Sequence, residues 1–227
     1  MVMDSEEKGK IKIDRFTWGF LETNMYVLQA ADDFLVIDPI DNVEILEKLK
    51  GSESLTVLLT HEHFDHICGL NKLREIATYK VIASQECSER IKDAKTNLSA
   101  YADVLAEIAE KQVPASWTPF CCESADFTFV DEYSFAWAGH LVKMIATPGH
   151  SAGSCCILID DMLFSGDTIL ENINITGFPG GSRKKYREVT VPILKYILPK
   201  VSFVYPGHGD AMSGEDAMRL IEMWVVR

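Results

Sequence analysis

The 227-residue sequence predicts a layered α/β fold in which two similar halves pack face to face. Short apolar runs typical of strands alternate with segments of helical pattern. Along the chain these segments follow the order β-rich, helical, β-rich and helical. Hydrophobic residues make up 47% of the chain and charged residues 25%, as in an ordinary globular protein, so a large core can be buried. We therefore expect a single domain that spans residues 1–227.

The first half is predicted to be mainly a sheet with crossover helices. Residues 31–33, Ala-Asp-Asp, separate two β-rich runs and so indicate a hairpin. Asp41 and Glu44 form a capping box for a helix that Gly51 would end. The apolar run at 55–59 is long enough for a buried strand. The expected elements are strands at residues 25–28, 34–37, 55–59 and 79–83 and helices at 41–50 and 70–76.

A helical insertion is predicted in the middle of the chain, at about residues 84–112. Leu98, Tyr101, Val104, Leu105 and Ile108 are spaced by threes and fours, which places them on one helix face. We expect this face to pack into the core; a substrate lid or a dimer surface is the alternative. The second half is expected to contain strands at residues 127–130, 133–137, 141–145, 155–159, 162–164 and 201–205 and helices at 184–197 and from 214 onward.

The charge balance excludes some classes of partner. Lys and Arg number 22 and Asp and Glu 34, which gives a net charge of −12 and argues against nucleic acid or an anionic membrane. No apolar run approaches the roughly 20 residues of a membrane span. Residues 1–12 are polar and unlike a secretion signal, and the six cysteines suit free thiols, so we expect a cytoplasmic protein.

Metal-binding side chains are concentrated directly after the predicted strand at 55–59. Within residues 60–66 lie His61, His63, Asp65 and His66. Imidazole nitrogen and carboxylate oxygen are the usual ligands of zinc, and they also bind iron and manganese. An exposed polar loop would explain one isolated histidine, but four donors in this order favour a metal site.

Three more donors follow later strands, each beside a glycine that permits a tight turn. They are His150 in Pro-Gly-His, Asp167 in Ser-Gly-Asp and His208 in Pro-Gly-His-Gly. Singly, each is typical of an ordinary turn. Together with the first four they make seven donors, which is enough for a site with two metal ions.

The ordered set of donors resembles that of the metallo-β-lactamase-fold hydrolases. The resemblance extends from about Thr23 to His208 and implies a four-layer αββα sandwich with its site at one edge of two packed sheets. It further implies that one metal is bound by His61, His63 and His150 and the second by Asp65, His66 and His208, with Asp167 bridging the two.

Residues 177–182 resemble the Pro-Gly-Gly-Ser loop of the glyoxalase II-like branch, which cleaves thioesters such as hydroxyacyl-glutathione. Phe178 replaces the acidic-Leu sequence that precedes the proline in that branch. The chain stops soon after His208, so we expect no carboxy-terminal helical domain for binding glutathione.

These features predict a metal-dependent hydrolase that cleaves a small-molecule thioester, ester or lactone. Two divalent ions would supply hydroxide at neutral pH, with Asp65 as the catalytic residue that orients it. We expect zinc, with iron or manganese as alternatives, and a homodimer is a further expectation. The alternative functions are an iron-dependent persulfide dioxygenase of the same fold and a non-enzymatic, metal-stabilised binding protein.

Three residues outside the donor set have alternative interpretations. Asp38, at a strand end, is either a partner of a metal-binding histidine or a simple turn residue. Cys68 is expected to be a small packing residue, and a nucleophile or redox-sensitive thiol is the alternative. His140 lacks a motif and is expected to be an exposed hairpin residue.

Overall fold

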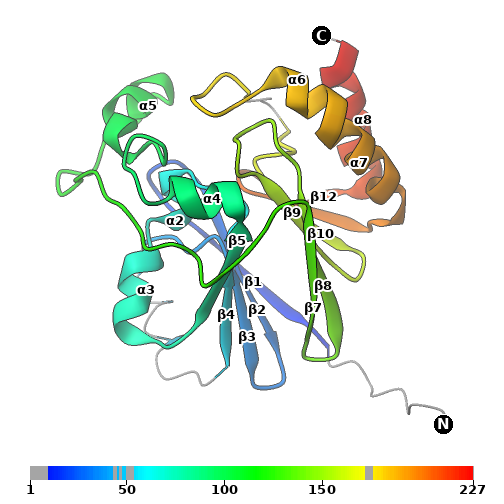
Figure 1. Ribbon diagram of the computed structural model, residues 1–227, viewed down its shortest axis with the longest axis horizontal. Coiled ribbons are helices and arrows are strands. Elements are labelled where there is room, and N and C mark those ends of the chain that lie inside the picture. The colour runs from blue at the N-terminus through cyan, green and yellow to red at the C-terminus, as the bar shows by residue number, and fades with distance from the viewer. Residues whose placement is uncertain (1–9, 43–44, 46–47, 50–53, 172–175, 227) are drawn as a thin grey trace.

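The computed structural model describes the chain except residues 1–9, 43–44, 46–47, 50–53, 172–175 and 227. Its centre is a pair of six-stranded sheets (Figure 1), with strand orders β1-β2-β3-β4-β5-β6 and β12-β11-β10-β9-β8-β7. The first sheet comprises β1 (Lys12–Thr17), β2 (Asn24–Ala30), β3 (Asp33–Ile37), β4 (Leu55–Leu58), β5 (Lys80–Ser84) and β6 (Phe127–Phe129). The second comprises β7 (Glu132–Trp137), β8 (His140–Ala146), β9 (Cys155–Ile159), β10 (Met162–Gly166), β11 (Phe203–Pro206) and β12 (Met212–Ser213).

Helices cover the outer face of each sheet, which completes four layers. Ile67 of α2, Leu70 of α3 and Cys87 of α4 pack on the outer face of the first sheet. Leu194 of α7 and Ile221 of α8 pack on the second. The helices are α2 (Phe64–Ile67), α3 (Leu70–Ile76), α4 (Gln85–Arg90), α5 (Ala102–Ile108), α6 (Arg183–Lys185), α7 (Val191–Ile197) and α8 (Gly214–Val226). The predicted αββα sandwich is confirmed.

The core between the sheets follows from the two-residue period of the strands. In β2, Met25 and Val27 face the outer helices, whereas Tyr26 and Leu28 face the second sheet. Successive strand residues point to opposite faces, so a strand buried on both faces is apolar throughout. Strand β3 pairs with β2 in antiparallel and with β4 in parallel, as the hairpin and crossover predict.

The helical insertion differs from its prediction. Leu98 adopts a left-handed backbone (φ 68°), which interrupts the expected helix between α4 and α5. In α5, therefore, Ala102 and Ala106 are the buried residues, while Val104 and Ile108 are 55% and 68% exposed. The apolar face predicted for the core lies partly at the surface.

Other expectations were wrong in detail. The helix expected at 184–197 consists of α6, a π-helical turn at Tyr186–Thr190 and α7. A short 3-10 turn at Leu198–Lys200 follows it. Half of the helix expected at 41–50 falls outside the described residues. Strands β1 and β12 were not predicted. None of the helices in the described part of the chain is long and apolar enough to cross a membrane.

Candidate metal centre

The seven predicted donors meet where strands of both sheets end. His61 and His63 follow β4, and Asp65 and His66 lie on the short helix α2 directly after them. The remaining three donors follow strands β8, β10 and β11 of the second sheet; they are His150, Asp167 and His208.

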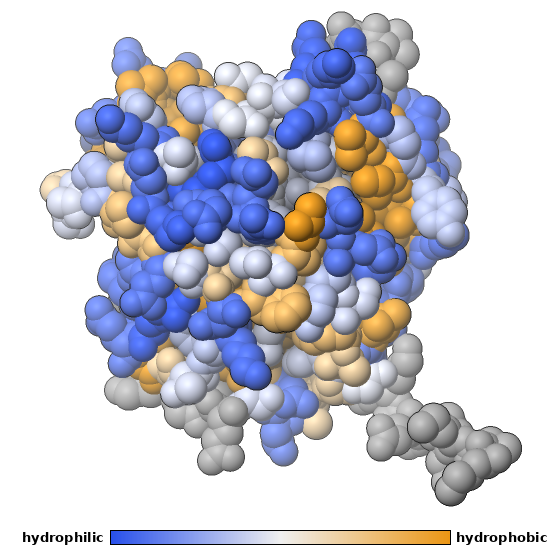
Figure 2. Space-filling model, viewed as in Figure 1, coloured by the Kyte–Doolittle hydropathy of each residue, from blue (hydrophilic) through white to orange (hydrophobic). Residues whose placement is uncertain are grey.

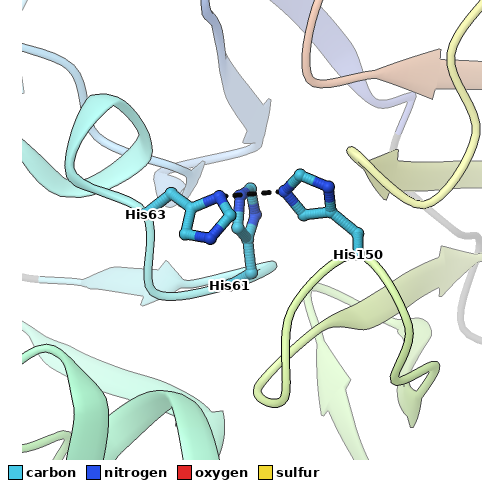
Figure 3. A group of neighbouring side chains, drawn as sticks. All are labelled: His61, His63 and His150. Carbon is cyan, nitrogen blue, oxygen red and sulfur yellow. Dashed lines mark hydrogen bonds between the residues drawn. The ribbon is translucent and has the colours of Figure 1, made fainter. Parts of the chain in front are cut away.

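The first group consists of His61, His63 and His150. One ring nitrogen from each lies within 4.8 Å of the others, and all three side chains are buried. Figure 3 shows the three rings facing one another, with His150 reaching in from the loop after β8. His150 Nε2 is 2.9 Å from His63 Nδ1. Three imidazoles converging from two sheets form one candidate metal position.

The second group consists of Asp65, His66 and His208, which also offer three ligand atoms within 4.8 Å of one another. Asp65 Oδ2 lies 3.5 Å from His66 Nε2 and 3.4 Å from His208 Nε2. This group therefore combines two imidazoles with one carboxylate, a ligand set that divalent transition metals accept.

Asp167 lies between the two groups. Its Oδ1 is 3.3 Å from His66 Nε2, and its Oδ2 is 3.4 Å from His208 Nε2 and 3.6 Å from His150 Nε2. Gly207 makes this approach feasible, because a Cβ there would lie 2.2 Å from Asp167 Oδ1. One carboxylate thus reaches donors of both groups.

Several of these buried atoms have no hydrogen-bond partner among the described residues. They are Nε2 of His61, His63 and His66 and Oδ1 of Asp167. Buried polar atoms in proteins are nearly always paired, so these unpaired atoms in residues of both groups require another explanation. Coordination of metal ions satisfies them, and the donor set therefore fits the predicted metals.

The protonation of the first group also suits metal binding. Burial, followed by the neighbouring imidazoles, lowers the pKa of His61 and of His63 well below the usual histidine value. Both rings are therefore neutral at pH 7, which is the form that binds a metal.

In the second group, the pKa values of the two histidines are raised rather than lowered. Burial alone would lower the pKa of His66, but the carboxylates of Asp65 and Asp167 raise it well above its usual range. The same competition raises the pKa of His208 to about 10, chiefly through Asp167. Burial would raise the pKa of Asp65, but His66 lowers it below the ordinary value. The two carboxylates are ionised and attract positive charge to this position.

Asp38 forms a hydrogen bond with His66, a candidate ligand of the second group. Its Oδ2 accepts a hydrogen bond from His66 Nδ1 at 2.8 Å, and its Oδ1 accepts from the Thr60 backbone at 2.7 Å. Its backbone is left-handed (φ 54°), a conformation that aspartate tolerates better than most residues. The bond at Nδ1 leaves Nε2 of His66 as the ligand atom and fixes the ring. Asp38 is thus a histidine partner rather than a simple turn residue.

Replacing Asp38 with alanine is expected to weaken zinc binding by about 10- to 100-fold, because His66 loses the acceptor that orients it. A competitive titration against a zinc-binding dye measures this affinity. Asp14→Ala, which removes an exposed carboxylate on β1, is the matched control and should leave the affinity unchanged. An Asp38→Ala affinity equal to that of the unmodified protein would contradict the assigned role.

Two further contacts at the second group were not predicted. Thr23 Oγ1 donates to Asp65 Oδ2 at 2.7 Å, and the Thr23 backbone forms an isolated antiparallel β-bridge with His208. His208 Nδ1 donates to the Leu21 carbonyl at 3.1 Å, which directs Nε2 toward the carboxylates. The segment before β2 therefore orients two of the candidate ligands.

A partly buried ion pair connects the loops of the first group. Glu62, between the two histidines, is fully buried, and its Oε1 lies 2.5 Å from Arg90 Nε. Ser151 donates to Glu62 Oε2 at 2.8 Å, next to His150. Arg90 also donates to the Pro179 carbonyl at 3.2 Å. The glutamate between the histidines was the available sequence signal, but its partners lie in distant segments.

Residues 177–182 lie against the first group. The Phe178 ring is centred 6.1 Å from that of His63 and 6.4 Å from that of His150. Ser182 donates its backbone N–H to the Gly149 carbonyl at 2.7 Å. The loop that resembles the glyoxalase II-like branch thus places a phenyl ring beside the candidate metal position.

Cys68 and His140 lie away from the cavity that the donors face. The Cys68 thiol accepts the Asp41 backbone N–H at 3.2 Å, and burial raises its pKa far above the usual thiol value. Its surroundings agree with the packing role. The expectation for His140 was wrong: this residue is buried, and its Nδ1 lies 2.6 Å from Asp160 Oδ2.

Two sheets between helical layers, with histidines and aspartates gathered at one edge, define a metal-binding αββα protein. Residues 18–208 match the family model of the Metallo-beta-lactamase superfamily. The chain therefore belongs to this superfamily of metallo-hydrolases.

Three curated relatives are 24–29% identical to this chain over the aligned segments. The chain is 28% identical to the "Probable metallo-hydrolase YqgX" of Bacillus subtilis, over 91% of its own length and 95% of the relative's. It is 29% identical to the "Probable polyketide biosynthesis zinc-dependent hydrolase BaeB" of Bacillus velezensis, over 67% of its length but only 55% of the relative's. A "Hydroxyacylglutathione hydrolase" of Shewanella pealeana is 24% identical, over 78% of this chain and 57% of the relative.

Solved structures agree with the fold. The B3 metallo-beta-lactamase BLEG-1 superposes with a TM-score of 0.74 at 26% identity and covers 92% of this chain and 97% of its own. TTHA1623 in a di-iron-bound form gives a TM-score of 0.63, also at 26% identity, over 91% and 98% of the two chains. A shared fold does not specify a substrate, so the substrate has to be argued from the site.

Proposed function

We propose that this chain is a hydrolase whose seven donors hold two divalent metal ions, and that it cleaves a small thioester, ester or lactone. One observation carries the proposal. Donors of both groups, together with Asp167, line a single cavity of about 430 Å³. A substrate in that cavity can meet both candidate metal positions at once.

The side chains of such a site would have different roles. His61, His63 and His150 would hold one ion, and Asp65, His66 and His208 the second, with Asp167 in contact with both. When bound, the ions activate water at neutral pH and polarise the carbonyl of the substrate. Thr23 fixes the carboxylate of Asp65 through Oδ2, so that Asp65 can orient the attacking water and accept its proton.

Zinc is the metal we propose. Five of the seven donors are histidines, and imidazole suits zinc. The name of one relative supports zinc, whereas one structural neighbour holds two irons, so iron has to be tested beside it.

The test is a hydrolysis screen on chelated protein and on protein reconstituted with zinc, manganese or iron. We expect thioester, ester or lactone cleavage only after metal is restored. Full activity in chelated protein, or no hydrolysis with any metal, would contradict the proposal. Oxygen uptake with glutathione persulfide and one iron per chain would instead identify the dioxygenase alternative.

A further inference from the structure

The cavity beside the donors is bounded largely by apolar side chains. It extends from His63, His150 and Asp167 along helix α5. Its apolar lining includes Leu21, Leu98, Leu105, Ile108, Leu170 and Phe178. Ligand pockets of roughly 300–1,000 Å³ are commonly apolar with a few polar groups at the reacting end, and this cavity has that arrangement.

Helix α5 forms one wall of the cavity because its two faces differ. Ala102 and Ala106, one turn apart, are both 2% exposed and pack in the core cluster of Phe20 and Phe64. Leu105 and Ile108, three residues apart, share the face toward the cavity. Figure 2 shows apolar residues, in orange, reaching the surface in the region of α5. Ile108 is 68% exposed and so lies at the mouth of the cavity.

Aromatic packing holds this wall in a fixed position relative to the donors. Trp117 lies 5.0 Å from Phe64 and 6.3 Å from Phe20, measured between ring centroids. Phe64 directly precedes Asp65 on α2. The cluster that buries Ala102 and Ala106 is therefore continuous with the helix that carries two candidate ligands.

Away from the candidate metal positions, the charged side chains that line the cavity are acidic. Besides the donors, Glu22 and Glu171 line it, and none of its described lining residues is lysine or arginine. The nearby Lys111 is not part of the lining, and its Nζ lies 2.7 Å from Glu22 Oε1. Away from the candidate metal positions, the two carboxylates of a glutathione conjugate would meet Glu22 and Glu171, with no lysine or arginine among the described lining residues to pair with them.

We infer that this cavity binds an uncharged apolar acyl chain, so that the substrate is a medium-chain acyl ester or thioester and not a glutathione conjugate. The inference rests on the proposed hydrolase function and deepens it. Leu105 and Ile108 are then the residues of α5 that determine specificity. Each methylene buried against them strengthens binding by about fourfold.

The first test varies the acyl chain. Zinc-loaded protein is assayed with acetyl, butanoyl, hexanoyl and octanoyl thioesters of N-acetylcysteamine, a neutral thiol, and with lactoylglutathione. We expect kcat/KM to rise about 16-fold for each two methylenes added and to be lower for lactoylglutathione than for the octanoyl thioester. A flat or falling series, or faster cleavage of the glutathione conjugate, would overturn the inference while the hydrolase function stands.

The second test places a charge on the wall. Ile108→Asp is expected to lower the octanoyl-to-acetyl ratio of kcat/KM by at least about tenfold, because a carboxylate then meets the chain. Val104→Asp is the matched control: Val104 is 55% exposed on the same helix but does not line the cavity. Val104→Asp should retain the octanoyl-to-acetyl ratio of kcat/KM. An equal decrease of this ratio in both variants would refute the claim that Ile108 contacts the acyl chain.

A binding measurement separates this inference from the proposed function. Calorimetric titration of zinc-loaded protein should show octanoate binding at least about tenfold more tightly than acetate. If no ester or thioester is cleaved but octanoate is preferred, the proposed function fails, whereas the binding of an apolar chain in this cavity stands. Equal binding of the two acids overturns the inference.

Discussion

Replacing Asp167 with alanine is expected to lower kcat/KM for ester or thioester hydrolysis by at least about 10³-fold, because the activation of water requires both metal positions. Asp167 contacts His66, His150 and His208, and is the side chain that reaches both groups. Its loss should also lower the metal content from two ions per chain. Activity assays and elemental analysis of the same preparation measure both effects.

His63→Ala is expected to lower hydrolysis comparably by removing one ligand of the first group. The control is Asp161→Ala at the opposite end of strand β10, where the side chain is exposed. It should retain activity and metal. Circular dichroism shows whether each variant is folded, and a folded Asp167→Ala protein with full activity would disprove the proposed site.

Zinc is expected to raise the melting temperature by roughly 8–16 °C for each site that it occupies, relative to chelated protein. Free zinc at about 1,000 times its Kd contributes about 4 kcal/mol per site, and each kcal/mol shifts a protein of this size by about 2–4 °C. The physical reason is that the unfolded chain does not hold the buried donors together. Differential scanning calorimetry at a fixed zinc concentration measures the shift.

Magnesium is the matched control for this shift. It prefers oxygen ligands and retains its waters, so a histidine-rich site should gain little from it. Asp167→Ala should show a smaller zinc shift than the unmodified protein. Identical melting temperatures with zinc and with chelator would mean that the clustered donors do not bind the metal.

The positions of the candidate donors could be predicted because each carries a local signal. His61, His63, Asp65 and His66 lie within six residues, at the end of a strand that apolar composition makes evident. The other three follow glycine at later strand ends. Packing two sheets brings such ends to one edge, so spacing along the sequence was sufficient to predict their meeting.

The hydrogen bonds that hold the donors in place could not be predicted in this way, because no short sequence pattern accompanies them. Thr23 lies 42 residues before Asp65, and Arg90 lies 28 residues after Glu62. Single threonine and arginine residues are common at surfaces, and only tertiary packing brings these two to the site. Asp38 could be proposed because it ends a strand, but its choice of partner, His66, also depends on packing.

The errors in the fold have local causes. A helix over residues 98–108 required regular backbone, and the left-handed Leu98 shifted which residues α5 buries. Strand β1 is an edge strand whose residues Asp14 and Arg15 interrupt the apolar alternation, so it lacked a strand pattern. In both cases the apolar pattern of the sequence did not reveal the structural feature, which is the backbone conformation of Leu98 in one case and the pairing of β1 with β2 in the other.

Anomalous diffraction from crystals of the zinc-loaded protein, measured at the zinc absorption edge, is the most direct test of the two-metal site. We predict two peaks per chain in the cavity, one among His61, His63 and His150 and one among Asp65, His66 and His208, with Asp167 between them. A single peak, or peaks outside this cavity, would contradict it.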